Sequence, residues 1–96
     1  MRLELAPAAE AEMIAAARYY EDRAPGLGER FLDEVLRASE GIKTYPESWP
    51  MISGQIRRCL VKRFPFSLLF RIETERIYVL AVMHLHREPN YWRTRS

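Results

Sequence analysis

The side chains best suited to chemistry lie between residues 57 and 92, where basic and aromatic residues alternate with apolar ones. Arginine and lysine can hold phosphates, and tyrosine or tryptophan can stack on a base. A positioned histidine, arginine or tyrosine can also move protons or stabilise charge when RNA is cut at a 2′-hydroxyl, with no metal required. The alternative is a basic surface that pairs with an acidic protein. The candidate residues are Arg57, Arg58, Lys62, Arg63, Arg71, His84, His86, Arg87, Tyr91 and Trp92.

Several common chemistries lack their motifs in this sequence, which has no glycine-rich phosphate loop, no CxxC and no HExxH. The only cysteine, Cys59, falls in a predicted strand, where we expect a small buried apolar residue rather than a nucleophile. His84 and His86 share one strand face, but no third metal ligand follows at a suitable spacing. We therefore expect neither a metal site nor another cofactor.

Charge is distributed unevenly along the chain. Residues 1–50 carry six Lys/Arg and ten Asp/Glu, a net charge of −4, whereas residues 51–96 carry nine and three, a net charge of +6. The sum agrees with the total of +2. A basic second half favours an acidic or polyanionic partner for that half.

Length and composition predict one small domain over residues 1–96, because 48% of the residues are apolar and 29% are charged. No apolar run approaches the roughly 20 residues that a membrane helix needs. The first residues form no apolar signal region. A single cysteine excludes an intrachain disulfide and fits a reducing compartment, so we expect a cytoplasmic protein.

Apolar periodicity and chain breakers predict the order β-α-α-β-β-β, with a helical hairpin packed on one face of an antiparallel sheet in the α+β class. We expect a strand over 2–6, helices over 7–23 and 27–45, a loop over 46–54 anchored by Trp49, and three strands, the first over 55–64. The second helix should bury Leu27, Phe31, Val35, Leu36, Ser39 and Ile42.

A two-residue turn at Thr74-Glu75 would fix the register of the last two strands and pair Ile72 with Ile77. The same register pairs Phe70 with Val79, Leu68 with Ala81 and Phe66 with Met83, all on one core face. The opposite face is basic and aromatic, and we expect function there. It holds Ser67, Leu69, Arg71, Tyr78, Leu80, Val82, His84 and His86.

Four stretches together resemble the RelE/ParE superfamily of small bacterial toxins from type II toxin–antitoxin pairs. They are the alanine-rich stretch from Ala9 to Tyr20, the G-x-x-F-x-x-E-V from Gly28 to Val35, Phe64-Pro65-Phe66, and the ending from Val79 to Arg95. The resemblance covers nearly the whole chain and implies the same helical hairpin on a sheet. It also implies one of two activities: metal-independent cleavage of messenger RNA on the ribosome, or inhibition of DNA gyrase without known catalysis.

The residues of the nuclease subgroup are only partly matched. The resemblance places Lys62 and Arg63 near its basic strand residues, Arg87 at its C-terminal arginine and Tyr91 near its tyrosine. Ser67 stands about where that subgroup has a middle-strand arginine, and a serine cannot supply a fixed cation to a phosphate.

This departure favours a ParE-like toxin that inhibits DNA gyrase and is neutralised by an antitoxin. The alternatives are a ribosome-dependent nuclease and an inactive relative that only binds its antitoxin, so whether the chain is an enzyme stays open. We expect the antitoxin to bind the helical hairpin and an exposed strand edge. A nuclease would use Arg87, Tyr91 and His84 in catalysis, and target contacts are expected from Arg57, Lys62, Arg63, Arg71, His86 and Trp92.

Overall fold

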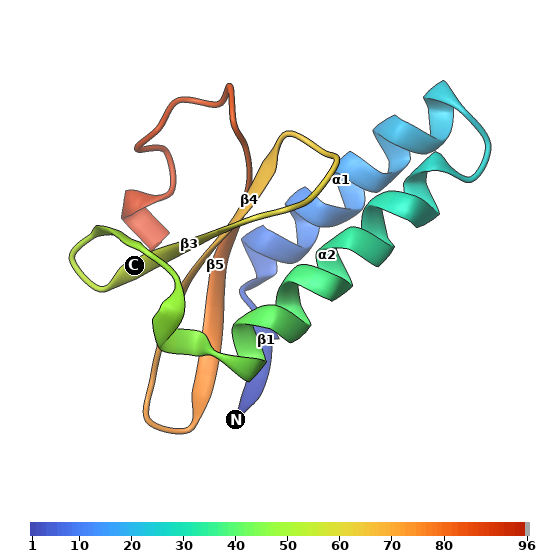
Figure 1. Ribbon diagram of the computed structural model, residues 1–96. Helices are drawn as coiled ribbons and strands as arrows, with labels where there is room; N and C mark the ends of the chain where they lie inside the picture. Colours follow the sequence, from blue (N-terminus) through green and yellow to red (C-terminus); the bar gives the residue numbers. More distant parts are fainter. Residues whose placement is uncertain (96) are drawn as a thin grey trace.

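The computed structural model describes residues 1–95 and places two antiparallel helices on one face of a twisted sheet (Figure 1). This arrangement confirms the predicted α+β class and the predicted order of strand, helical hairpin and strands. The elements are β1 (Arg2–Leu5), α1 (Pro7–Arg23), α2 (Leu27–Thr44), the 3-10 helix η1 (Pro46–Ser48), β2 (Met51–Ser53), β3 (Ile56–Leu60), β4 (Phe66–Ile72), β5 (Arg76–His84) and the 3-10 helix η2 (Arg93–Arg95).

The sheet has five strands in the order β1-β5-β4-β3-β2. Strand β1 pairs parallel with β5, with Leu3 opposite Ile77, so the sheet is mixed rather than wholly antiparallel as predicted. An alternating pattern does not encode strand direction, which explains the error. The predicted loop over 46–54 contains the short strand β2, because Gly54 takes a left-handed φ of 54° and turns the chain back onto β3.

A bulge changes the predicted register of β4 and β5. The predicted pairs of Ile72 with Ile77 and Phe70 with Val79 are confirmed. The next predicted pairs are wrong, because Leu69 lies opposite Ala81 and leaves Leu80 as an extra residue on β5. As a result Leu68 pairs with Val82 and Phe66 pairs with His84. Val82 therefore joins the core beneath the helices, whereas Ala81 and Met83 turn to the other face.

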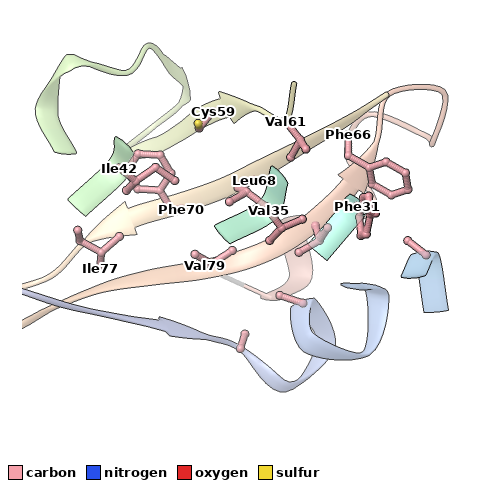
Figure 2. Packing of buried hydrophobic residues seen from close by; sticks show 14 residues of the cluster. Phe31, Val35, Ile42, Cys59, Val61, Phe66, Leu68, Phe70, Ile77 and Val79 are labelled. Carbon is pink, nitrogen blue, oxygen red and sulfur yellow. The ribbon is translucent and has the colours of Figure 1, made fainter. Parts of the chain in front are cut away.

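The main core lies between the helices and the sheet (Figure 2). Phe31 from α2 meets Phe66 from β4 with ring centroids 5.0 Å apart. Cys59 is 1% exposed in this core, as predicted. Trp49 packs against the core and anchors the segment over 46–54, also as predicted. The core contains Phe31, Val35, Ile42, Cys59, Val61, Phe66, Leu68, Phe70, Ile77, Val79 and Val82.

The two helices approach each other closely at Gly28, where a Cβ atom would lie 2.5 Å from the carbonyl oxygen of Ala17. Glu21 of α1 accepts hydrogen bonds from the backbone N–H groups of Gly26 and Gly28 and so caps the start of α2. Leu36 was predicted to be buried, but it is 60% exposed because it lies on the outer side of the hairpin. None of the helices in residues 1–95 is long and apolar enough to cross a membrane.

Candidate functional site

The C-terminal tail, residues 85–95, folds back over the side of the sheet that faces away from the helices (Figure 1). Its anchor is Trp92, which is 2% exposed and donates an indole hydrogen bond to the carbonyl oxygen of Pro89 at 2.9 Å. Trp92 completes a second apolar cluster with Ile56, Leu69, Leu80, Ala81 and Met83. A ring buried to this extent packs in the structure and offers almost no surface to a partner.

Glu12 of α1 ties the tail to the sheet. Its carboxylate accepts hydrogen bonds from the Tyr91 hydroxyl at 2.6 Å and from the Arg95 guanidinium at 2.8 Å. It also accepts one from the backbone N–H of Val82 at 3.1 Å. Burial of the phenol and its hydrogen bond to Glu12 raise the pKa of Tyr91 well above its ordinary value. Tyr91 is therefore protonated at neutral pH and acts here as a donor rather than as a base.

Arg87 and Tyr91, two of the residues that a nuclease would use, lie together in the tail. The Arg87 guanidinium carbon stands 4.1 Å from the centre of the Tyr91 ring, a cation–π contact, and Arg87 itself is exposed. The Arg95 guanidinium faces the same ring at 4.9 Å. The tail therefore presents Arg87 as an exposed cation on an aromatic ring whose hydroxyl is hydrogen-bonded to Glu12.

The two histidines lie at the start of the tail. His84 is half-buried against Phe66, with ring centroids 5.0 Å apart, and its Nδ1 accepts a hydrogen bond from the backbone N–H of His86. The bulge places His84 opposite Phe66 on the helix side, away from the face on which function was expected. His86 is exposed.

Three other predicted target contacts have separate structural partners. Arg57 donates to the carbonyl oxygens of Glu47 and Trp49, at 3.0 and 2.7 Å, and holds the loop before β2. Arg63 pairs with Glu34 of α2 at 2.8 Å. Arg71 pairs with Glu73 at 2.7 Å, at the far end of β4. These guanidinium groups therefore do not converge on one site.

Lys62 and Arg58 complete the basic set, and both are exposed on or just after β3. Lys62 lines a small pocket between α2 and β3 together with Trp49 and Cys59. Within residues 1–95, no three His, Cys, Asp or Glu side chains lie close enough together to hold a metal ion.

Ser67 is fully buried, and its hydroxyl oxygen has no hydrogen-bond partner in the part of the chain that the structure describes. It pairs with Leu60 and with Met83 across the sheet. An arginine at this position would bury a cation among apolar side chains at a large energetic cost. The departure from the nuclease pattern at Ser67 is therefore matched by a local environment that suits a small residue.

Sequence reasoning missed Glu12 and Arg95 as parts of this site. The two residues are 83 positions apart, and Glu12 reads simply as one of the acidic residues that favour the start of a helix. No local pattern links them, because the contact depends on how the tail returns across the sheet.

Comparison with known proteins identifies the family. The family model described as the ParE toxin of the type II toxin–antitoxin system, parDE, matches residues 3–89. The chain belongs to the ParE toxin family. The matched stretch runs from β1 through β5 and ends within the tail, before Tyr91 and Trp92. Membership of a toxin–antitoxin family implies an antitoxin partner for this ParE-family chain.

A solved structure of similar fold is titled the chromosomal ParDE TA system from P. aeruginosa. It matches with a TM-score of 0.65 at 23% sequence identity, over 90% of this chain and 97% of the other. At this identity the likeness concerns the fold. No curated protein matches the sequence.

Proposed function

We propose that this ParE-family toxin arrests growth by inhibiting DNA gyrase, that it binds its target through the exposed face of the C-terminal tail, and that a cognate antitoxin neutralises it. The observation that carries the proposal is the family match over residues 3–89. The tail supplies the proposed binding surface. Arg87 is an exposed cation that lies on the Tyr91 ring, and the exposed His86 precedes it in the sequence.

The arrangement of the basic residues favours binding over catalysis. Cleavage at a 2′-hydroxyl needs several groups that converge on one phosphate, each with a free donor or proton. Here Arg63 and Arg71 pair with separate carboxylates, and the Tyr91 hydroxyl is held by Glu12. A binding toxin needs only an exposed surface that complements its target.

The direct test is supercoiling by purified gyrase in the presence of the purified toxin. We expect inhibition that rises with toxin concentration and that falls at least about tenfold in the Arg87→Glu variant, because a reversed charge repels the surface that an arginine attracts. Arg30→Glu is the matched control, since Arg30 is an exposed arginine on α2, across the sheet from the tail. Undiminished supercoiling at excess wild-type toxin would refute the proposal.

Messenger RNA cleavage is the second candidate, and the contact between Arg87 and Tyr91 is the observation that favours it. In a translation extract this hypothesis expects cut messenger RNA with the wild-type chain and intact RNA with a folded Arg87→Ala variant. Intact RNA at a dose that stops translation would remove the hypothesis. Normal growth on expression without the antitoxin would remove both activities and leave an inactive relative.

We propose that the antitoxin binds the outer side of the helical hairpin and the free edge of β1. Large apolar side chains are exposed there, with Ile14 41%, Leu32 39% and Leu36 60% exposed. A groove of about 460 Å³ runs beside them and is lined in part by Leu3, Leu5, Met13, Leu32 and Leu36. Exposed apolar grooves of this kind fit an amphipathic helix or an added strand.

Co-purification of the toxin with its antitoxin tests this surface. Leu36→Glu places a charge in the groove and should abolish co-purification. Leu60→Glu is the control, because Leu60 is similarly exposed at 55% but lies on β3 and does not line this groove. Loss of binding in the control alone would place the antitoxin elsewhere.

A further inference from the structure

The edge of β5 is only half covered by a neighbouring strand. β1 pairs with Arg76 to Val79, and the backbone N–H of Ala6 continues this pairing with a hydrogen bond to the carbonyl oxygen of Val79 at 2.9 Å. After Ala6 the chain enters α1, so within residues 1–95 no strand pairs with residues 80–84 on this side. Backbone polar groups at such an edge need other partners.

Two side chains supply those partners. Glu12 accepts the hydrogen bond of the Val82 N–H at 3.1 Å, and Arg95 donates to the carbonyl oxygen of Leu80 at 3.2 Å. The two side chains also pair with each other at 2.8 Å, with side-chain exposures of 17% for Glu12 and 23% for Arg95. Charge-assisted hydrogen bonds in a partly buried site are stronger than neutral ones. The pair therefore takes the place of a missing strand and joins α1, β5 and the end of the tail.

The same carboxylate controls the ring of Tyr91. The Tyr91 hydroxyl donates a hydrogen bond to Glu12 at 2.6 Å. The Arg87 guanidinium carbon lies 4.1 Å from the centre of the Tyr91 ring. Arg87 is exposed, so this ring contact is its main restraint among the contacts described here. An unrestrained arginine loses rotational freedom when it binds a partner, whereas one already held in place loses less.

We infer that Glu12 is a positioning residue: from α1 it fixes Tyr91 and Arg95, and through the Tyr91 ring it presents Arg87 in the orientation that the target recognises. The inference rests on the proposed function, in which Arg87 contacts gyrase. Two of the residues that it joins, Tyr91 and Arg95, lie beyond the family match, which ends at residue 89.

Glu12→Gln is the decisive variant, because glutamine keeps the size of the side chain and an acceptor for the Val82 N–H but removes the charge that holds Arg95 and Tyr91. We expect trypsin to cut after Arg87 and Arg93 about ten times faster, since a released tail opens locally without global unfolding. Gyrase inhibition should weaken about tenfold. Glu10→Gln is the matched control, because Glu10 is exposed on the same helix and undergoes the same change of charge.

Two further variants separate positioning from a general loss of structure. Tyr91→Phe removes the hydroxyl but keeps the ring, so it should release the tail less than Glu12→Gln does. The exchange of Glu12→Arg with Arg95→Glu restores the ion pair but not the hydrogen bonds to the Val82 N–H and the Leu80 carbonyl oxygen. It should therefore recover only part of the trypsin resistance and of the inhibition that the single Glu12→Arg variant loses. Far-ultraviolet circular dichroism verifies that each variant is folded, and Tyr91→Phe carries the test if Glu12→Gln is not.

Failure of the inference differs from failure of the proposed function. If wild-type toxin leaves gyrase active, the proposed function fails, and the trypsin experiment still decides whether Glu12 holds the tail. If wild-type toxin inhibits gyrase and Glu12→Gln inhibits it equally well, Glu12 does not position Arg87, whether or not the tail is released. An unchanged rate of tail cleavage in Glu12→Gln would overturn the inference at its first step.

Discussion

Glu34 of α2 and Arg63, which follows β3, form an ion pair at 2.8 Å, although the glutamate is only 5% exposed. Arg37 donates to the same carboxylate oxygen at 2.9 Å. Both arginine side chains are largely exposed, so two cations at the surface compensate one carboxylate in the interior. This compensation matters because an unpaired buried charge is costly. Arg63, expected from the sequence to contact the target, has a structural role here.

The shared oxygen predicts that Arg37 and Arg63 are not independent. Each single alanine variant should lose about 0.5 kcal/mol of stability, because the other arginine remains on the carboxylate. The double variant should lose about 2–3 kcal/mol, more than the sum, because Glu34 is then buried without a partner. Urea denaturation of the four proteins in the cycle measures the coupling, and the same cycle with Glu34→Gln should be additive. Additive losses with Glu34 present would contradict the prediction.

Arg63 has a φ of 69°, the one left-handed value among the non-glycine residues that the structure describes. Alanine and glycine at this position both remove the guanidinium, but only glycine adopts this conformation without strain. Arg63→Gly should therefore be about 1 kcal/mol more stable than Arg63→Ala, the reverse of the usual order within helices. The difference between their urea midpoints is the measurement, and equal stability would mean that the loop relaxes around alanine.

Two glycines of α2 predict opposite responses to alanine. At Gly28 a Cβ atom would lie 2.5 Å from the carbonyl oxygen of Ala17, so Gly28→Ala must separate the helices and should cost about 2 kcal/mol. At Gly41 the Cβ atom would lie 3.4 Å from Trp49, close to ordinary contact. Gly41→Ala should therefore be stabilising by up to about 1 kcal/mol, the helix propensity of alanine over glycine. Thermal melts of both variants decide, and a shift of the same sign in both would count against the close contact at Gly28.

The helical hairpin could be predicted because its signals are local. Pro7 begins α1 as expected, and the Ala24-Pro25-Gly26 break separates two helices whose predicted bounds, 7–23 and 27–45, differ from the structure by one residue. The pairing of residues 70–72 with residues 77–79 was also predictable, because the adjacent turn at residues 73–76 fixes its register.

The pairing of residues 66–69 with residues 81–84 and the position of the tail could not be predicted in this way. No glycine or proline marks the bulge at Leu80 in the sequence. The one extra residue moves every later side chain of β5 to the opposite face of the sheet from the one predicted. The burial of Trp92 depends on that exchange, since Ala81 and Met83 are the residues that turn toward it. A tail that packs on a sheet through such contacts follows from tertiary structure and has no periodic pattern of its own.

Cys59 gives a prediction about pH. Burial raises the pKa of its thiol from 9.0 to about 11. At pH 8 a thiol with this pKa is about 0.1% thiolate, so folded protein should react with iodoacetamide far more slowly than protein unfolded in guanidinium chloride.

The raised pKa also affects stability, because between pH 9 and pH 11 the unfolded chain releases a proton that the folded chain retains. This part of the stability is complete below pH 9 and is lost as the pH rises to 11. Urea denaturation at pH 7, 9 and 10.5 measures it. Cys59→Ala is the control, because it has no thiol to titrate while every tyrosine and lysine is unchanged. The stability of the wild-type protein should therefore fall more steeply above pH 9 than that of Cys59→Ala, and parallel curves would show that the thiol titrates alike in both states.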